Sequence, residues 1–290
     1  MSSKLRYPPL WSKFFPTVLI SWLTGIFARA RFPLLIQGQL NQWFVSFFSI
    51  DMSEAGENLA HFRSIEDLFI RRLRPGLRPV ASEPLVSPCD GTVSMCRSLD
   101  ADGQLIQAKD FLYSPTELLG LDGGHSSPPA SYGTIYLAPH NYHRVHSPVD
   151  GRIMSVTYIR GELWPVNRLF VQKMPKLFVR NERAIFAIDT SCGGRIWLAM
   201  VGALNVGRIR INALANFETN GAERRFQSSR GIDCHILNLA INKGDEIGAF
   251  LLGSTVVMVM DREAEKCVGK MQYPENTPII LGQPLLRSRT

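Results

Sequence analysis

Residues 250–260, FLLGSTVVMVM, place a flexible and polar Gly253-Ser254-Thr255 between two apolar runs near the carboxyl end of the chain. Both flanks are rich in the apolar and β-branched residues that suit a buried strand. A glycine within such a pattern usually marks a bulge or a bend. The same peptide bond can instead be a site of chemistry, because Gly253 lets the backbone bend until the Ser254 hydroxyl reaches the preceding carbonyl carbon.

Attack of the Ser254 hydroxyl on that carbonyl would convert the Gly253–Ser254 peptide bond into an ester. β-Elimination would then expel the carboxylate of Gly253 and leave dehydroalanine, which tautomerises and hydrolyses to a pyruvoyl group with release of ammonia. The chain contains no G-x-S-x-G, so the nucleophile elbow of an α/β-hydrolase is not supported. Self-cleavage needs a base for the hydroxyl proton and a group that orients the base.

Half of the six histidines lie in residues 139–148, PHNYHRVHSP, at His140, His143 and His146. Three interpretations compete for them: acid–base chemistry, a metal site in which histidines three residues apart converge, and a polar loop without function. No acidic or cysteine residue lies within this stretch to complete a set of metal ligands. The metal site therefore ranks below the other two.

Two acidic residues lie on similar turns. Residues 87–93, SPCDGTV, and 147–153, SPVDGRI, share the pattern S-P-x-D-G-x-[VI] sixty residues apart. Asp-Gly before an apolar strand predicts a turn, although the repeat can also reflect a duplicated β-motif with pseudo-symmetry. Asp90 and Asp150 are both eligible to orient a histidine, and their spacing does not choose between them. On residue types alone, a Ser-His-Asp hydrolase and a self-cleaving enzyme look alike.

The chain of 290 residues changes character along its length. Residues 1–60 have a helical pattern, and a further helix starts at Ser64 and is stopped by Pro75-Gly76. A capping box at Ser114 predicts another helix. Strands are predicted over 91–97, 105–108, 133–138, 152–159, 184–190, 195–201, 206–211, 247–251 and 255–260.

This pattern favours an α+β protein: a mostly antiparallel β sandwich or barrel core with an N-terminal helical, membrane-docking region. The predicted boundary separates a membrane-associating part, 1–78, from a β-rich catalytic domain, 79–290. The five cysteines are odd in number and include no C-x-x-C pair, which argues against a disulfide framework and fits a reducing compartment. We expect each cysteine to act as a small buried apolar residue.

Residues 1–50 hold five basic residues, ten Trp and Phe residues and no acid. This composition is typical of a segment that lies on an anionic membrane, and the alternative is an ordinary helical subdomain with a solvated basic face. The uncharged run 14–28 is only 15 residues long and contains Pro16 and Gly25, so we do not predict a transmembrane span. A signal peptide is the minority interpretation. Nucleic acid is not the expected partner, because the basic residues are mixed with aliphatic ones.

Three stretches together, SPCDGTV (87–93), YHRVHSP (142–148) and LGST (252–255), resemble the phosphatidylserine decarboxylases, in particular the membrane-associated bacterial form. The stretches LFIRRLRPGLRP (68–79), LFVRNER (177–183), VGALNVG (201–207) and KGDEIGAFLLGSTV (243–256) agree with this family. The resemblance implies decarboxylation of phosphatidylserine to phosphatidylethanolamine and CO2, through a Schiff base on a pyruvoyl group derived from Ser254. It also implies that neither a metal nor pyridoxal phosphate takes part.

The resemblance carries residue roles with it. Cleavage at Gly253-Ser254 would give a β chain, 1–253, and an α chain, 254–290. Asp90 and His146 match the pair that activates Ser254 in the family. The resemblance therefore selects Asp90 rather than Asp150 as the acid. His143 matches a histidine of the decarboxylation stage.

Phosphatidylserine is an anionic bilayer lipid, so the resemblance also implies a peripheral protein on the cytoplasmic side of the bacterial inner membrane, assembled as a homodimer of αβ units. The rival from another class is a non-enzymatic β-barrel module that binds or carries lipid. Chain integrity separates these hypotheses, because neither that module nor a serine hydrolase would break before residue 254.

Overall fold

The computed structural model describes residues 17–99, 103–108, 111–120, 127–204, 208–214, 217–219, 231–251 and 254–286. The helices within these ranges are α1 (Thr17–Arg29), α2 (Leu34–Phe48), α3 (Ile65–Phe69), α4 (Pro115–Leu119), α5 (Arg168–Val171), α6 (Leu177–Arg180) and α7 (Arg262–Val268), with a 3₁₀ turn at Leu59–His61. The strands are β1 (Gly91–Ser98), β2 (Leu105–Ala108), β3 (Phe111–Tyr113), β4 (Pro129–Leu137), β5 (Arg144–His146), β6 (Gly151–Ile159), β7 (Arg183–Thr190), β8 (Arg195–Val201), β9 (Ile209–Ile211), β10 (Ile232–Ile241), β11 (Glu246–Phe250), β12 (Ser254–Asp261) and β13 (Thr277–Ile279).

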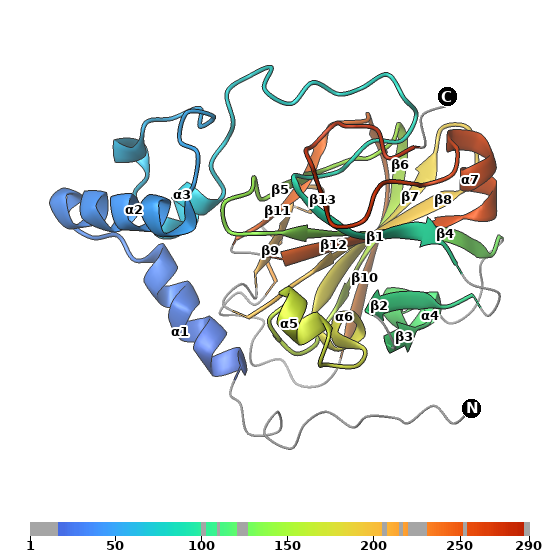
Figure 1. Ribbon diagram of the computed structural model, residues 1–290, viewed down its shortest axis with the longest axis horizontal. Helices are drawn as coiled ribbons and strands as arrows, with labels where there is room; N and C mark the ends of the chain where they lie inside the picture. The colour runs from blue at the N-terminus through green and yellow to red at the C-terminus, as the bar shows by residue number, and fades with distance from the viewer. Residues whose placement is uncertain are drawn as a thin grey trace.

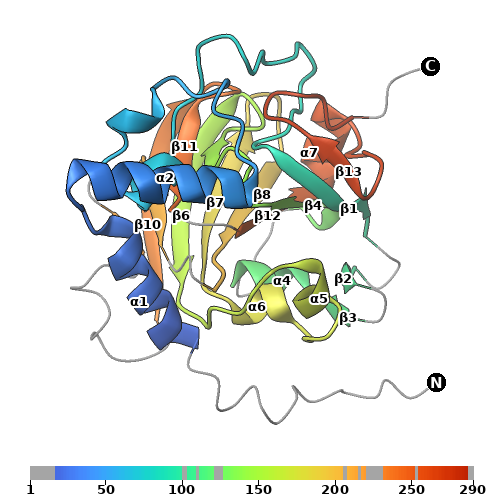
Figure 2. The same ribbon diagram turned by 60° about the vertical axis from the view of Figure 1, so that its left-hand side comes forward.

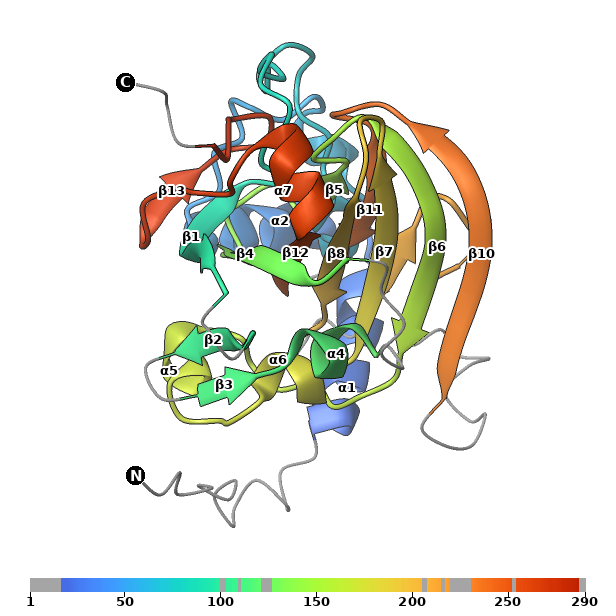
Figure 3. The ribbon, with the colours of Figure 1, turned by 90° about the vertical axis from the view of Figure 1, so that its right-hand side faces the viewer.

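Eight strands form one curved sheet in the order β10-β6-β7-β8-β12-β4-β1-β13 (Figure 3). Every neighbouring pair in it is antiparallel. A smaller sheet, β5-β11-β9, and the pair β2-β3 complete the strands, and α1, α2 and α3 lie together at one side of the sheet (Figure 1). The predicted α+β class with an antiparallel core and N-terminal helices is confirmed.

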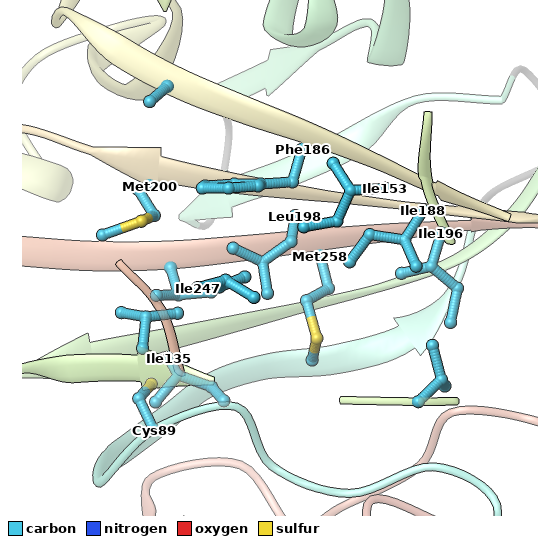
Figure 4. Close-up of a cluster of buried hydrophobic side chains, with 14 of the residues drawn as sticks. Cys89, Ile135, Ile153, Phe186, Ile188, Ile196, Leu198, Met200, Ile247 and Met258 are labelled. Atoms are coloured by element: carbon cyan, nitrogen blue, oxygen red, sulfur yellow. The ribbon is translucent and has the colours of Figure 1, made fainter. Parts of the chain in front are cut away.

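The side chains of the central strands pack into two separate hydrophobic cores, because successive side chains of a strand point to opposite faces of the sheet. In β7, Phe186 and Ile188 enter the first core, whereas Ile185 and Ala187 enter the second. Figure 4 shows the first core, where side chains from neighbouring strands of the large sheet meet. The second core is closed by β2, β3, α4 and α6. Burial on both faces explains the nearly continuous apolar sequence of β12.

The large sheet has an internal two-fold relation. Its order can be divided into two halves, β13-β1-β4-β12 and β10-β6-β7-β8, which meet at the pair β12–β8. The second half lies, in sequence, between β4 and β12 of the first. The two S-P-x-D-G stretches occupy corresponding positions, each directly before an equivalent strand, β1 or β6.

The contacts of the two stretches repeat as well. The Ser87 hydroxyl donates to the carbonyl of Cys89, and the Ser147 hydroxyl donates to the carbonyl of Val149, both at 2.7 Å. The two Asp side chains also match, since Asp90 accepts from the backbone N–H of Leu281 and Asp150 from that of Lys243, both at 2.8 Å. The sequence repeat is therefore a duplicated β-motif.

Two predicted helix starts are confirmed, and one predicted helix end is wrong. The Ser64 hydroxyl accepts a hydrogen bond from the N–H of Asp67 at 3.0 Å, and Ser114 forms its capping box. The helix at Ser64 ends at Phe69 instead of continuing to Pro75-Gly76. The Nε–H of Arg144 donates to the carbonyl oxygen of Ile70 at 2.9 Å, and this contact turns the backbone away from the helix.

The prediction for the cysteines is wrong in part. Cys192 and Cys267, which are 75 residues apart, form a disulfide with a Cα–Cα distance of 5.9 Å. Cys89 and Cys96 are buried as expected, but Cys234 is exposed. Pairing of cysteines cannot be deduced from sequence alone, so the fold was needed to reveal this bond.

Candidate active site

Ser254 opens β12, the strand between β8 and β4 in the middle of the large sheet. Its backbone lies opposite Leu137, and its side chain is 1% exposed. The Ser254 Oγ atom has no hydrogen-bond partner within the described part of the chain. A buried hydroxyl without a hydrogen-bond partner lowers the stability of a protein by about 1–3 kcal/mol. Such a group in a native core therefore often has a functional role. Gly253, predicted as the other half of the cleaved bond, lies outside the described residues.

His143 lies in the loop between β4 and β5 and is fully buried. Its ring packs on the ring of Phe69 from α3, with the centroids 4.0 Å apart. The Nδ1 atom lies 2.9 Å from the carbonyl oxygen of Asn141, so it carries the proton and donates it to that oxygen. The Nε2 atom is left as an acceptor with no partner among the described residues. Burial lowers the pKa of His143 to about 3, which keeps the ring neutral near pH 7.

Pairing of β5 with β11 fixes where the histidines lie relative to Ser254. The N–H of Phe250 donates to the carbonyl of His143 at 2.9 Å, whereas His146 lies opposite Glu246. The chain continues from Phe250 towards Ser254, so His143 is at the end of β11 from which the predicted cleavage segment leaves. Phe250, which contacts His143, and Glu246, which lies opposite His146, are four residues apart along β11. At about 3.3 Å per residue, this corresponds to about 13 Å.

His146 is engaged on both ring nitrogens. Nδ1 lies 2.8 Å from the carbonyl oxygen of Gly244, and Nε2 lies 3.3 Å from the hydroxyl of Tyr142. Since a carbonyl can only accept, Nδ1 carries the proton and the tyrosine hydroxyl donates to Nε2. Burial lowers the pKa of His146, while the bond to Gly244 and the charges of Glu246 and Asp90 oppose that shift.

Asp90 is 3% exposed, and its carboxylate is bound by one arginine and one backbone N–H rather than by a histidine. Arg78 donates to both of its oxygens, with Nε 3.0 Å from Oδ1 and Nη2 2.7 Å from Oδ2. The same guanidinium binds Glu54. Among the described residues, no hydrogen bond joins the predicted partners Asp90 and His146. They are neighbours through the backbone, because the N–H of His146 donates to the carbonyl of Pro88 at 2.8 Å.

The duplicated motif explains why its two acids are not equivalent. The backbone N–H of Val86 donates to Pro148 just as that of His146 donates to Pro88. Val86 is therefore the counterpart of His146, and it places an apolar side chain beside the second turn. Asp150 is also exposed, whereas Asp90 is buried. The two turns therefore differ: Asp90 is buried and near the backbone of His146, whereas Asp150 is exposed and near the backbone of Val86.

Sequence reasoning missed two residues that shape the site. Phe69 covers the face of His143, and Arg71 holds the loop before it. Arg71 is 3% exposed and donates through Nη2 to the carbonyl of His140 at 2.8 Å, and more weakly to that of Asn141 at 3.5 Å. Its Nε and Nη1 atoms have no partner within the described residues. The signal in the sequence was the run of four arginines in LFIRRLRPGLRP, directly after a short apolar helix.

Comparison with known proteins identifies the family. The profile of the family described as phosphatidylserine decarboxylase matches residues 65–287, most of the chain. The chain belongs to the phosphatidylserine decarboxylase family. A phosphatidylserine decarboxylase proenzyme of Herminiimonas arsenicoxydans is 35% identical over 290 residues, covering 98% of this chain and 94% of the relative. Proenzymes of the same name from Shewanella denitrificans and Helicobacter pylori are each 37% identical, covering 86% and 85% of this chain and 86% and 90% of their own length.

Membership of the family confirms the resemblance and makes the chain a decarboxylase, that is, a lyase. The rival hypotheses of a non-enzymatic lipid carrier and of a serine hydrolase are thereby excluded. The relatives are named as proenzymes, which agrees with a precursor that is processed. The roles of individual residues stay predictions.

Proposed function

We propose that this chain decarboxylates phosphatidylserine to phosphatidylethanolamine and CO2, after cutting itself between Gly253 and Ser254. The observation that carries the proposal is the buried, unpaired hydroxyl of Ser254 at the head of a central strand. No other hydrogen bond competes for this oxygen among the described residues, so it is available as a nucleophile. The residues of β12 are buried along the whole strand, which limits the access of water to the ester before elimination.

In the proposed cleavage, a histidine takes the Ser254 proton as the oxygen bonds to the Gly253 carbonyl carbon. The nitrogen of residue 254 takes up a proton and becomes a free amine as its bond to that carbon breaks. Loss of the Cα proton then expels the Gly253 carboxylate and leaves dehydroalanine. Addition of water and loss of ammonia give the keto group.

The family resemblance assigns proton removal to His146, oriented by Asp90. One contact supports this pair: the N–H of His146 donates to the carbonyl of Pro88, two residues before Asp90. The position of His143 beside Phe250 and its unpaired Nε2 support it as the second candidate for a proton acceptor. For His146 to act, Tyr142 must release Nε2, whereas the Nε2 of His143 is already unengaged.

The pyruvoyl group at residue 254 supplies a carbonyl that condenses with the substrate amine and withdraws the electron pair released with CO2. The residues around it fit this role. Ser254 lies in a strand that is buried along its whole length, and His143 is a buried, neutral ring whose Nε2 atom has no hydrogen-bond partner among the described residues. We propose that the Nε2 atom of His143 takes up a proton only while substrate is bound, and passes it to the substrate carbon that has lost CO2.

The experiment is the intact mass of the purified, denatured protein. We expect two chains that split after Gly253, with the α chain, 254–290, blocked at its N-terminus. Ser254→Ala should stay a single species of 32.5 kDa. Thr255→Ala is the matched control, because Thr255 also carries a buried hydroxyl without a partner in the described residues, and this variant should still be cut. A single wild-type species that persists during incubation with phosphatidylserine vesicles would refute the proposal.

Comparing rates separates the two histidines. Cleavage is followed over time in the variants His146→Ala and His143→Ala. If the resemblance assigns the base correctly, His146→Ala should not be cleaved. The second variant should then be cut but fail to release CO2. The reverse pattern would assign proton removal to His143.

We further propose that α1 and α2 attach the protein to the surface of an anionic membrane, on the cytoplasmic side of the inner membrane. α2 turns its polar residues inwards: Gln37 and Asn41 are buried, and Asn41 donates to the carbonyl of Phe62 at 2.9 Å. Large apolar side chains face outwards instead. The exposed ones on α1 and α2 are Leu23, Ile26, Phe27, Leu34, Leu35, Ile36, Trp43 and Phe47.

A water-soluble helix would place these residues the other way round, so the arrangement favours burial of the outer face in lipid. Arg29 and Arg31 lie where α1 meets α2, and residues 17–50 contain no acid, which suits an anionic surface. Figure 2 shows both helices along one side of the molecule. Among the described residues, no helix is long and apolar enough to cross a bilayer.

Vesicle sedimentation tests this attachment. Replacing Trp43 and Phe47 by Ser should lower the bound fraction strongly without changing the unfolding free energy, because both side chains are exposed. Leu112→Ser is the control, since Leu112 is 45% exposed on β3, away from these helices. Equal binding of all variants would contradict the proposal.

The homodimer expected from the resemblance is also a proposal. β10 is an edge strand of ten residues whose outer side exposes Ile232, Ile236 and Leu239. Such an edge invites pairing with another strand, and a second copy would bring an identical one. Sedimentation equilibrium of wild type and Ile236→Lys tests this, and a wild-type monomer at micromolar concentration would refute it.

A further inference from the structure

We propose that the Cys192–Cys267 disulfide is a covalent link between the two chains of the processed protein. This inference rests on the proposed cleavage after Gly253, because that bond lies between the two cysteines in sequence. Cys192 belongs to the β chain, in the turn between β7 and β8, and Cys267 belongs to the α chain, on α7. A bond that closes a loop within the precursor thus joins two polypeptides after cleavage.

The fold brings the two cysteines together independently of the bond. The turn that carries Cys192 packs on α7 so closely that a Cβ atom at Gly194 would lie 2.0 Å from the backbone nitrogen of Ala264. Only glycine fits there, and its φ of +79° also suits glycine. Asp261 accepts a hydrogen bond from the N–H of the same Ala264 at 2.7 Å, which fixes the start of α7.

The sulfurs have a defined environment between these elements. The Thr190 hydroxyl lies 3.8 Å from the sulfur of Cys192 and 3.7 Å from that of Cys267, and it donates to the carbonyl of Gly193. The Cα–Cα distance of 5.9 Å lies within the range that an unstrained disulfide needs. The backbone therefore presents the pair in bonding position, and closing the bond requires no rearrangement of the sheet.

The link is open to thiol chemistry from solvent, because Cys192 is exposed and Cys267 is half-buried. In forming, the two thiols release two protons and two electrons, and a small disulfide such as oxidised glutathione takes them up as two thiols. In opening, two glutathione thiols reduce the bond and leave as oxidised glutathione. The redox state of the surroundings thus decides whether the α chain is covalently retained.

Covalent retention of the α chain affects refolding after the protein has unfolded. Without the link, the α chain is held by non-covalent pairing of β12 with β8 and β4 and of β13 with β1. Unfolding then separates two polypeptides, and refolding becomes a reaction between two molecules. With the link, refolding stays unimolecular.

Denaturing electrophoresis tests the link directly. The wild-type protein is equilibrated with oxidised glutathione, its free thiols are blocked with N-ethylmaleimide in denaturant so that the buried Cys89 and Cys96 also react, and it is run with and without dithiothreitol. We expect one band near 32.5 kDa without reductant, and separate β and α chains with it. Cys192→Ser should give two chains in both lanes. Cys234→Ser, which removes an exposed free thiol, should behave like wild type.

Two wild-type chains without reductant would overturn the link while leaving the cleavage intact. One band in both lanes would mean that cleavage itself has failed, and the interchain role would fall with it. The bond is then scored by counting blocked thiols by mass: three of the five cysteines label if Cys192 and Cys267 are joined, and five label if they are not.

Discussion

Lowering the pH should destabilise the fold through His143, by an amount that follows from its burial. The ring is fully buried under Phe69, and its pKa falls from the ordinary 6.5 to about 3. Between pH 6.5 and pH 3, the histidine is protonated in the unfolded chain but not in the folded one. The free energy of unfolding is therefore unaffected by His143 above pH 6.5 and decreases as the pH falls towards 3. At pH 5, 1.5 units below the unfolded pKa, the loss is about 2 kcal/mol.

The assay is urea unfolding followed by tryptophan fluorescence at pH 7.5 and pH 5. Ser254→Ala serves as the background, because a chain that is not cut unfolds as one molecule. His143→Asn is the test variant, since its amide can still donate to the carbonyl of Asn141. The background should lose about 2 kcal/mol more than the test variant on going from pH 7.5 to pH 5.

His140→Asn in the same background is the control, because His140 is exposed and replacing it should leave the pH dependence unchanged. Comparison of variants also cancels the contribution of His146, which is present in all of them. Equal pH dependence with and without His143 would refute the reasoning that its ring is kept neutral by burial.

Three further predictions concern the surroundings of the site. In the uncut background, Phe69→Ala should cost about 3–5 kcal/mol of unfolding free energy, read by urea titration, because it leaves a cavity over His143; a loss below about 1 kcal/mol would contradict the packing. Arg71→Lys should slow cleavage at least tenfold on a gel time course, since an ammonium cannot hold the loop carbonyls as the guanidinium does; an unchanged rate would remove its positioning role. Asp90→Asn should block cleavage while Asp150→Asn permits it, both followed by intact mass, and equal behaviour of the two would contradict the distinction between the paired turns.

The parts of the fold that were predictable are those in which local pattern and burial agree. The apolar runs of β7, β8 and β12 are buried on both faces and leave little ambiguity. β10 was missed because it is largely exposed and its register shifts between Ile236 and Leu239, which breaks the alternation of apolar and polar residues. β5 was missed because three residues are too short to show any period.

The site was predictable in its residue types but not in its pairings. Gly253-Ser254 stood out because a polar pair interrupts an apolar strand, and the histidines stood out because they cluster. The register of β5 on β11, which puts His143 rather than His146 next to Phe250, depends on contacts a hundred residues apart in sequence. Burial of Arg71 and the disulfide likewise arise from long-range packing that no local pattern encodes.

The short helix α3 contacts both α2 and the loop that carries His143. Its Phe69 packs on His143 with ring centroids 4.0 Å apart, and the ring of Phe44 from α2 lies 6.3 Å from that of Phe69. These packed rings connect the helix that we propose to lie on lipid with His143. With α2 on the lipid surface as proposed, encounters with substrate take place in two dimensions, and turnover should follow the mole fraction of phosphatidylserine in the vesicle rather than its bulk concentration. Diluting the lipid with a neutral surfactant at constant total phosphatidylserine should slow the enzyme for this reason.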